Sequence, residues 1–546
     1  MSLTNRLARR RFLVHLGLVS TGVLVAACAP TPTPQPTQAP AGQAPVATQV
    51  PQKTALPATK TPVTLTYWGQ LAGKLTTLVT NHNEAPIFQE LEKRTGVHID
   101  YQHPPAGQQV SEQFNLLVAS GNYPDIIEWN WLSFPGGPEK AIKDKVILRL
   151  NEVVDQYAPN LKKMYAGRPD RRKAATTDEG NQYVFPFMRE INCWTGLVTR
   201  GDWMEKLGLQ VPTTVDELHT MLAAYKTKDP NGNDKADEWP FGPGLGTNPV
   251  SAYANHAIVG AWGIAWNYYN EKGTVKYGPA QPAFKEFLRM MVAWYKEGLI
   301  DPEFVSMDKK AVDARITGGQ WGTWVGAAAA GMGAYLLLME KTDPKYSLVG
   351  LPYPTLQKGE RPLLGQFAND YPGTASAAIT TSCKRVREAA EWLDYPYGPE
   401  GHMLVNFGVE GVGYNMVNGE PKMTELALGA EAPKYRRSLD AGPFIQDLRA
   451  YLASLTFPTQ LAAVKTWTEP VNEMHLPPMS PTVEESKRMA TITQEMNTLF
   501  SESVLKVLTG AVPVEDWDRV VEQMKKIGLD EAIKINQAAL ERYEKR

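Results

Sequence analysis

Strand and helix patterns alternate through the first part of the chain, and this alternation limits the possible folds most. Residues 63–68 read Val-Thr-Leu-Thr-Tyr-Trp, an alternating β-rich run that predicts a strand. A helix is predicted over 85–95, ended by Gly96, with further strands over 97–101 and 124–129. Strands separated by helices are typical of βαβ units, so we predict an α/β fold.

The same patterns continue along the chain. Helices are predicted over 111–119, 151–157, 215–226, 282–297, 386–395, 483–507 and 514–545, and strands over 183–187, 320–325 and 376–380. Residues 318–339 carry no charge and are long enough to raise the question of a membrane span. Gln320 and several glycines interrupt them, so we interpret them as a buried strand and a following helix.

Length, charge and cysteines narrow the function. At about 100–200 residues per domain, 546 residues allow two or more domains. The net charge is −2 and basic residues form a block only near the start, so we expect no nucleic-acid partner. His82, His98 and His103 are interpreted as exposed loop residues, and no zinc-ligand spacing occurs. Whether Cys193 and Cys383 pair is left open.

The start of the chain has the layout of an export signal. Residues 1–27 combine a basic beginning, an apolar run and small residues before Cys28. Arg-Arg-Arg-Phe-Leu at 9–13 resembles a twin-arginine motif, and Leu-Val-Ala-Ala-Cys at 24–28 resembles a bacterial lipobox. The resemblance implies that Cys28 becomes a lipidated N-terminus outside the cytoplasmic membrane. The alternative is an ordinary secretory signal with an incidental cysteine.

Residues 28–62 predict a tether. They are rich in Pro, Thr, Gln and Ala and almost lack large apolar side chains, so they cannot bury a core. In polyproline geometry of about 3 Å per residue, such a segment reaches on the order of 100 Å. We therefore expect a folded body held at a distance from a membrane.

A loop at 229–238 carries the sharpest chemical pattern. Oxygen donors alternate along it: Asp229, Asn231, Asn233, the Lys235 carbonyl, Asp237 and then Glu238. Ca²⁺ takes about six to eight oxygens, and the spacing resembles the opening of an EF-hand loop. Asp234 replaces the usual glycine, and Glu238 closes the loop early. We predict a structural calcium site; the alternative is a plain turn rich in Asp and Asn.

Several motifs resemble those of extracellular solute-binding proteins, the substrate-capturing lipoproteins of ABC importers. They are Gln-Phe-Asn-Leu-Leu-Val-Ala-Ser-Gly at 113–121, Tyr-Pro-Asp-Ile-Ile at 123–127, and the stretches 200–209, 388–395, 398–401 and 406–411. The loop at 229–238 is similar to the calcium loop of alginate-oligosaccharide-binding members. The resemblance implies a type II periplasmic-binding-protein-like fold, with two lobes, a hinge, a central cleft and a helical C-terminal extension. It also implies an oligosaccharide ligand, including alginate- and aldouronate-type sugars, and an ABC permease partner.

This fold sets expectations for the division of the chain. We expect a first lobe over 63–188, a second lobe over 189–318, a return to the first lobe over 319–380, and the second lobe with its helical tail over 381–546. The lobes are expected to close around the ligand, because contacts from both favour the closed state. The protein is expected to be a monomer.

Aromatic and planar polar side chains mark the expected sugar site. Flat rings cover the apolar face of a sugar, and amides or carboxylates bond its hydroxyl groups. The candidates are Trp68, Trp129, Asn130, Trp131, Trp194, Trp262, Trp266, Trp321, Trp324, Asp370 and Tyr371. Only one of Trp321 and Trp324 is expected to face the cleft, because they lie three residues apart on a strand. The alternative for each indole is core packing.

Two further side chains could distinguish acidic from neutral sugars. Arg189 or Arg200 could meet a uronate carboxylate, because a guanidinium is planar and always charged. The alternative for either arginine is a surface ion pair.

The competing class is a secreted glycoside hydrolase, which needs a pair of carboxylates across a sugar cleft. Glu128, Asp370 and Glu410 are candidates, but no local pattern selects a pair. The chain has no Gly-x-Ser-x-Gly elbow and no His-Glu-x-x-His motif. We therefore expect a binding protein and not an enzyme, with a peptide or lipid binder as a further alternative.

Overall fold

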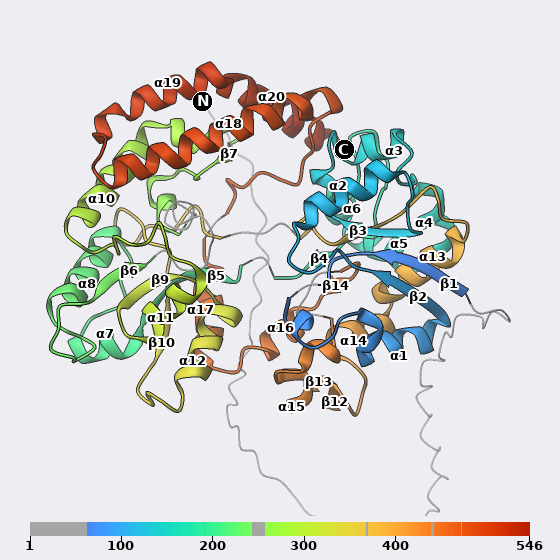
Figure 1. Ribbon diagram of the computed structural model, residues 1–546, viewed down its shortest axis with the longest axis horizontal. Helices are drawn as coiled ribbons and strands as arrows, with labels where there is room; N and C mark the ends of the chain where they lie inside the picture. Colours follow the sequence, from blue (N-terminus) through green and yellow to red (C-terminus); the bar gives the residue numbers. More distant parts are fainter. Residues whose placement is uncertain are drawn as a thin grey trace, which may run out of the picture. The chain divides into compact units, whose positions relative to one another are not determined.

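The computed structural model describes residues 63–71, 73–191, 193–242, 257–366, 370–437, 442–470 and 472–546. The predicted signal, Cys28 and the tether lie outside these residues. The described chain contains two four-stranded sheets, each with its own hydrophobic core, and a helical C-terminal region (Figure 1). We call the parts around the two sheets the first and the second lobe. The predicted α/β class is confirmed.

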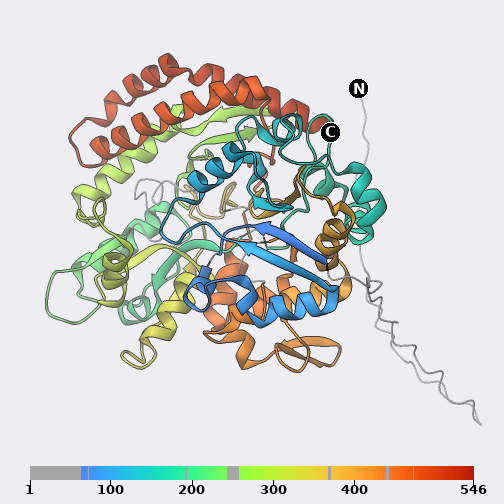
Figure 2. The same cartoon turned by 45° about the vertical axis from the view of Figure 1, so that its right-hand side comes forward.

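The first sheet has the strand order β11-β3-β1-β2. Its strands are β1 (Val63–Trp68), β2 (Val97–Gln102), β3 (Ile126–Trp129) and β11 (Ser376–Ile379). The first three are parallel, as βαβ units require, with β1 and β2 side by side in register from Val63 and Val97 (Figure 2). Strand β11 joins antiparallel to β3. Because these strands are buried at alternate positions or throughout, the hydrophobic pattern predicted them.

Helices complete the first lobe. They are α1 (Pro86–Thr95), α2 (Val110–Ser120), α3 (Gly137–Lys143), α4 (Asn151–Tyr157), α5 (Pro159–Gly167), α6 (Pro169–Ala174), α13 (Val386–Asp394), α14 (Pro399–Phe407) and α15 (Glu425–Leu428), with a hairpin of β12 (Tyr414–Val417) and β13 (Glu420–Met423). Short turns of 3₁₀-helix lie at η1 (Gly73–Thr77), η2 (His82–Glu84), η3 (Trp131–Ser133), η7 (Tyr395–Tyr397) and η8 (Ala432–Lys434). The strand predicted over 183–187 is reduced to a single bridge between Phe185 and Ala377.

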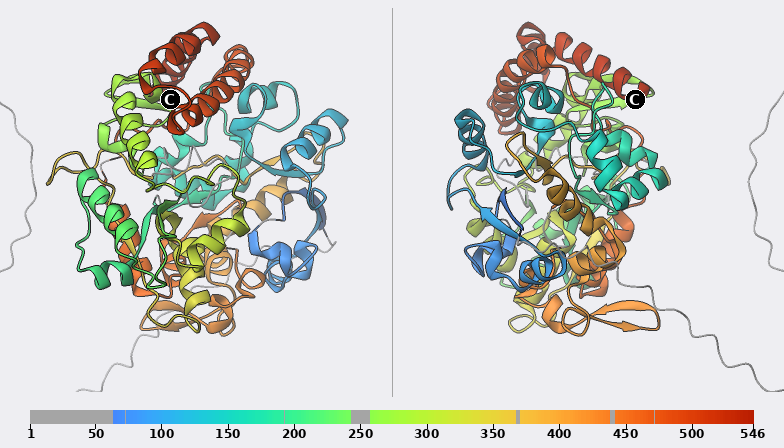
Figure 3. Two further views of the ribbon diagram at one scale, coloured as in Figure 1. Left: turned by 60° about the vertical axis from the view of Figure 1, so that its left-hand side comes forward. Right: turned by 90° about the vertical axis from the view of Figure 1, so that its right-hand side faces the viewer.

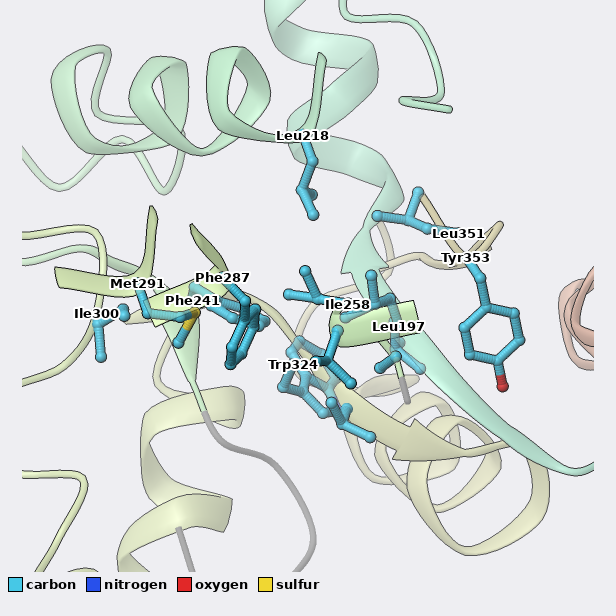
Figure 4. Close-up of a cluster of buried hydrophobic side chains, with 14 of the residues drawn as sticks. Leu197, Leu218, Phe241, Ile258, Phe287, Met291, Ile300, Trp324, Leu351 and Tyr353 are labelled. Atoms are coloured by element: carbon cyan, nitrogen blue, oxygen red, sulfur yellow. The ribbon is translucent and has the colours of Figure 1, made fainter. Parts of the chain in front are cut away.

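The second sheet has the order β10-β5-β9-β6. Its strands are β5 (Thr195–Arg200), β6 (Trp239–Gly242), β9 (Trp321–Ala327) and β10 (Leu348–Leu351), and its helices are α7 (Gly201–Leu207), α8 (Val215–Thr227), α10 (Pro282–Lys296), α11 (Lys309–Thr317), α12 (Ala334–Met339) and α17 (Pro458–Trp467). Helix α16 (Leu448–Ala453) touches both lobes, because Ala450 packs with Phe407 and Tyr414 while Tyr451 and Leu452 pack against the second core. A hairpin of β7 (Tyr268–Glu271) and β8 (Thr274–Tyr277), and the turns η4 (Val259–Trp262), η5 (Gly278–Ala280) and η6 (Ala328–Gly333), complete it. Leu197, Phe241 and Trp324 of the sheet meet Phe287 of α10 in the core (Figure 4).

The sheets divide the chain differently from the expected limits. Residues 319–380 were expected to return to the first lobe, but β9 and β10 pair with β5 in the second sheet. The return occurs only at β11. Helix α13, expected in the second lobe, packs its Trp392 edge-on against Tyr67 in the first core. A strand pattern shows that a segment is buried, but it does not show which sheet takes it, so sequence could not assign these segments.

Three described segments connect the lobes at one place. Strand β4 (Met188–Arg189) pairs in parallel with β14 (Ile445–Gln446). The Arg189 amide donates to the carbonyl of Asp370, at 2.8 Å, on the segment that leads to β11. The Gln366 side chain accepts from the Trp194 amide, at 3.1 Å. This meeting of crossing segments is the expected position of a hinge.

The C-terminal helices touch both lobes. They are α18 (Val483–Leu508), α19 (Trp517–Ile527) and α20 (Leu529–Lys545), with the turn η9 (Val514–Asp516). One continuous segment was predicted over 514–545, but Gly528, with φ 133°, separates α19 from α20. Helix α18 packs on α10 of the second lobe and on α3 of the first (Figure 3).

Ion pairs also join this region to the first lobe. The Asp178 carboxylate accepts from Arg542 at 2.8 Å and from Arg546 at 2.7 Å. Arg542 bonds Glu485 of α18 as well. We call this group the tail cluster.

The described residues contain neither a disulfide bond nor a membrane-spanning helix. Cys193 and Cys383 are both buried and free, Cys193 in the second core and Cys383 in the first. No described helix is long and apolar enough to cross a membrane, and 318–339 form the predicted strand and helices instead.

Candidate ligand-binding site

A cavity of about 270 Å³ opens where β1 and β3 end in the first lobe. It is lined by Trp68, Gln70, Leu75, His82, Phe88, Val110, Glu128, Trp129, Asn130, Thr374, Ala375, Pro433 and Arg437. In α/β folds, ligands bind outside the carboxyl ends of the strands, and this cavity has that position. Three predicted residues, Trp68, Trp129 and Asn130, therefore share one site.

Aromatic rings form one wall of the cavity. Trp129 stacks on Phe114, with ring centroids 4.2 Å apart and planes 11° apart. Trp68 packs at a tilt against both rings, with its ring centroid 6.2 Å from that of Trp129 and 6.0 Å from that of Phe114. The indole of Trp129 is thus held at a fixed angle by core packing, which is the arrangement of a rigid stacking surface.

Two polar atoms beside this wall have no partner. Trp129 Nε1 and Asn130 Oδ1 are shielded from water and make no hydrogen bond with the described residues. Gly373 brings its backbone close to Asn130, where a Cβ would come within 2.9 Å of Oδ1. Unpaired buried polar atoms are costly, so this donor and this acceptor are suited to bond the hydroxyl groups of a ligand.

The lining of the cavity also includes a charge pair, Glu128 and Arg437. Glu128 accepts from the Tyr67 hydroxyl, and Arg437 lies 3.8 Å from the same carboxylate oxygen. Burial raises the pKa of Tyr67 well above its usual value, and the charge of Glu128 adds to the effect. Arg437 also stacks over Phe88, at 5.1 Å. The pair therefore presents fixed polar groups to a ligand.

His82 lines the cavity and is buried, not exposed as expected. Its ring lies 4.4 Å from Phe88 and edge-on to Tyr101 at 4.9 Å. Burial lowers the pKa of His82 from 6.5 to about 2, and the nearby Arg437 charge acts in the same direction. His82 is therefore neutral in the folded protein. No sequence pattern indicated this burial, because His82 begins a single 3₁₀ turn, η2, which is too short to show a periodicity.

This neutral histidine predicts a loss of stability in acid. Below pH 6.5 His82 binds a proton in the unfolded chain but not in the folded protein. Its contribution to the stability of the folded state is therefore complete above pH 6.5 and falls as the pH drops toward 2. The free energy of unfolding, measured with urea, should fall by up to about 1.4 kcal/mol per pH unit between pH 6.5 and 5 because of this group. His82→Leu should flatten the slope, while His98→Leu, at an exposed site, should keep it. Equal slopes for all three proteins would contradict the assignment.

Four predicted residues lie inside the cores. Trp131, Trp321, Trp324 and Tyr371 are fully buried. Trp131 Nε1 donates to the Ser376 carbonyl, and Trp321 Nε1 donates to Asp301. The expectation that one of Trp321 and Trp324 faces a cleft is corrected, because β9 is covered on both faces. These rings serve packing in this structure.

The remaining candidates have other partners. Trp262 packs on Phe287, at 5.6 Å, and Trp266 on Phe500, at 5.2 Å, both half-buried in the second lobe. Trp194 is half-buried at the crossing segments. None of the three lines the cavity in the first lobe.

The acidic candidates are not gathered into one pair. Of Glu128, Asp370 and Glu410, Glu128 alone lines the cavity. Asp370 accepts from Arg168 at 2.6 Å and from Arg171 at 3.1 Å. The Asp370 carboxylate is thus already engaged by two cations of the protein itself.

Sequence reasoning missed several lining residues. Arg437, Pro433 and Thr374 come from segments far along the chain and carry no local motif. Gln70 follows the first strand directly, and its position at a strand end could have indicated it.

The loop at 229–238 joins α8 to β6 in the second lobe. Asp229 and Asp234 have positive φ angles of 44° and 60°, beside Gly232 at 72°. The Asp229 carboxylate accepts from the Gly232, Asn233 and Asp234 amides. The loop therefore turns back on itself around the Asp229 carboxylate.

Glu238 closes this loop in an unusual environment. Its side chain is fully buried, and neither carboxylate oxygen accepts a hydrogen bond of ordinary geometry. Burial raises its pKa, and the charges of Asp229 and Asp237 raise it further. A buried carboxylate beside two others needs a counter-charge, so the donor set fits a hard cation. Within the described residues, no cluster of three or more His, Cys, Asp or Glu side chains forms a metal site.

The sequence is similar to that of known solute-binding proteins. Residues 80–403 match the family described as bacterial extracellular solute-binding protein. The fructooligosaccharide ABC transporter substrate-binding protein FusA of Streptococcus pneumoniae is 28% identical over 497 residues, which cover 85% of this chain and 88% of that protein. Lipoprotein LipO of Bacillus subtilis is 24% identical over 348 residues, covering 62% of this chain and 65% of LipO.

Solved structures share the architecture. The alginate-binding protein AlgQ2, solved without calcium ion, has a TM-score of 0.73 and 26% identity, covering 89% of this chain and 99% of that one. Two-lobed solute-binding proteins thus confirm the expected fold. The matched region spans more than half of the sequence. The chain belongs to the bacterial extracellular solute-binding protein family.

Proposed function

We propose that this protein is the substrate-binding component of an ABC importer and captures an oligosaccharide outside the cytoplasmic membrane. The observation that carries the proposal is the cavity wall of Trp68 and Trp129, beside Asn130, whose Oδ1 has no partner among the described residues. Rigid indoles next to unpaired polar groups match the two sides of a sugar ring. The similarity to FusA, a fructooligosaccharide-binding protein, and to AlgQ2, an alginate-binding protein, supports the ligand class.

Binding would proceed from the first lobe. A sugar ring would lie on the Trp129 indole, with hydroxyl groups at Asn130 and at the Glu128–Arg437 pair. Closure at the crossing segments would bring the second lobe over the ligand, with contacts that favour the closed state. We propose that residues 195–366 move as one body and the first lobe as the other.

The loop at 229–238 would hold calcium as a structural ion. The side chains of Asp229, Asn231, Asn233, Asp237 and Glu238 and the Lys235 carbonyl would supply the oxygens. Calcium would compensate the buried Glu238 charge and fix the loop beside β9, where Asn231 already bonds the Gly319 carbonyl at 3.1 Å. The similarity to AlgQ2 supports this assignment.

The start of the chain would anchor the protein. Cys28 would carry lipid after removal of 1–27 through a twin-arginine route, and 28–62 would act as the tether. The relative LipO is a lipoprotein, which supports the anchor. Metabolic labelling with a palmitate analogue should mark the wild type and not Cys28→Ala.

The ligand class is tested with a panel of purified oligosaccharides. For each sugar, the melting temperature and the release of shorter products are measured together. A rise in melting temperature without product supports the binding protein. Product release would instead support a glycoside hydrolase, and a response to peptides alone would place the ligand outside carbohydrates.

A further inference from the structure

Arg189, at the point where the lobes connect, is a cation with no counter-ion among the described residues. It lies half-buried at the end of β4, and its Nε is shielded from water and has no hydrogen-bond partner among the described residues. No carboxylate of the described residues lies within ion-pair distance of its guanidinium. Burial lowers its pKa, as expected for a charge removed from water.

Other buried arginines in the same region are neutralised. Arg171 pairs with Asp370 at 3.1 Å, and Arg437 lies 3.8 Å from Glu128. Arg200, the other arginine considered for an acidic sugar, pairs with Asp202 at 2.5 Å and packs between Trp203 and Tyr346. The structure therefore removes Arg200 from consideration and leaves Arg189 as the candidate with no ion-pair partner in the described part of the chain.

Aromatic rings hold the Arg189 guanidinium in place. Its carbon lies 4.6 Å from the centre of the Trp194 ring and 5.1 Å from that of Phe187. Stacking on rings leaves the edge of a guanidinium, with its N–H groups, free to bind an anion. The backbone on both sides is fixed, because the Arg189 amide bonds Asp370 and the Trp194 amide bonds Gln366.

The position of Arg189 connects it to the sugar cavity. The Phe187 amide donates to Ser376 Oγ, and Ser376 pairs with Trp129 in the first sheet. A ligand that extends from Trp129 toward the second lobe would pass the crossing segments. A half-buried charge held without a partner is still costly, so this place favours ligands that bring a negative charge.

We propose that Arg189 binds the carboxylate of an acidic sugar, so that the ligand is a uronate-containing oligosaccharide and not a neutral one. This inference rests on the proposed function. The two N–H groups at one guanidinium edge match the two oxygens of a carboxylate, and such paired bonds are strong and directional. A neutral sugar would leave this half-buried charge without a partner.

The test uses two ligands that differ chiefly in charge. Trigalacturonate and its methyl ester are titrated by calorimetry into the wild type, Arg189→Gln and Arg189→Lys, with the neutral trisaccharide kestose as a third probe. Arg361→Gln, at an exposed arginine of the second lobe, is the matched control. Alginate trimer replaces trigalacturonate in a parallel series, so that a preference between uronates does not hide binding.

The wild type should bind the acid form of at least one uronate more tightly than the ester and kestose. Arg189→Gln should weaken binding of the acid by about tenfold or more and change ester binding little. Arg189→Lys should recover part of the loss, and Arg361→Gln should behave as wild type. Affinity for the acid should also fall as salt is added.

A second measurement separates binding from a merely structural role. Without ligand, Arg189→Gln should keep or raise the melting temperature, because it removes an unpaired buried charge. A lower melting temperature with unchanged acid affinity would overturn the proposal. Tight binding of kestose with no binding of uronates would also overturn it, while leaving the proposed function intact. Failure of every carbohydrate would defeat both.

Discussion

Replacing Trp129 with alanine is expected to weaken oligosaccharide binding by about tenfold or more. The indole lines the cavity, and Phe114 holds it at a fixed angle, so it can stack on a sugar without losing further freedom. A tenfold loss corresponds to about 1.4 kcal/mol, which is modest for an aromatic side chain at the centre of a binding site. Calorimetric titration with the tightest sugar of the panel gives the value.

Controls separate stacking from folding. Trp129→Phe should retain most of the affinity, because a flat ring remains. Trp239→Ala removes a half-buried indole near Lys226 in the second lobe and should leave affinity unchanged. Circular dichroism must show that Trp129→Ala is folded. Wild-type affinity in a folded Trp129→Ala protein would remove the ring from the site.

Chelation is expected to lower the melting temperature. An ion present at about a hundred times its dissociation constant stabilises the folded state by about 2.7 kcal/mol, which for a folded body of this size corresponds to a shift of about 3 °C. Scanning calorimetry with EDTA, and then with excess Ca²⁺, should show the loss and its reversal. Sugar binding should weaken but persist, because the loop lies in the second lobe and the cavity in the first.

The effect of Glu238→Gln on stability should have opposite signs without and with calcium. Without the ion, the variant should be more stable than wild type, because it removes a buried charge beside Asp229 and Asp237. With calcium, it should be less stable, because a ligand is lost. Asp234→Asn alters an exposed carboxylate of the same loop outside the predicted ligand set, and it should follow the wild type. A melting temperature indifferent to EDTA would count against the ion.

Local features were predictable where the chain itself carries the signal. Strand β1 alternates buried and exposed side chains over its first residues, and Gly96 ends α1 in the left-handed conformation, so both were visible in the sequence. The loop at 229–238 carries all its donors within one turn. A pattern of this kind needs no knowledge of the rest of the fold.

The sugar site was predictable only in part, because it depends on tertiary packing. Trp129 and Trp131 are two residues apart, yet one lines the cavity and the other is fully buried. The strand ends at Trp129, and the turn that follows directs Trp131 inward. Arg437 reaches the cavity from a distant segment, and its role depends on a long-range approach to Glu128 that no local pattern records.

The tail cluster limits how the two sheets can rotate. Helix α18 rests on α3 and α10, and Arg542 and Arg546 fasten α20 to Asp178. Bending the crossing strands alone would pull these contacts apart. Any change of angle must therefore slide α18 along one of its neighbours or break the arginine pairs, so the movement combines bending with shear, and the final helices act as its stop.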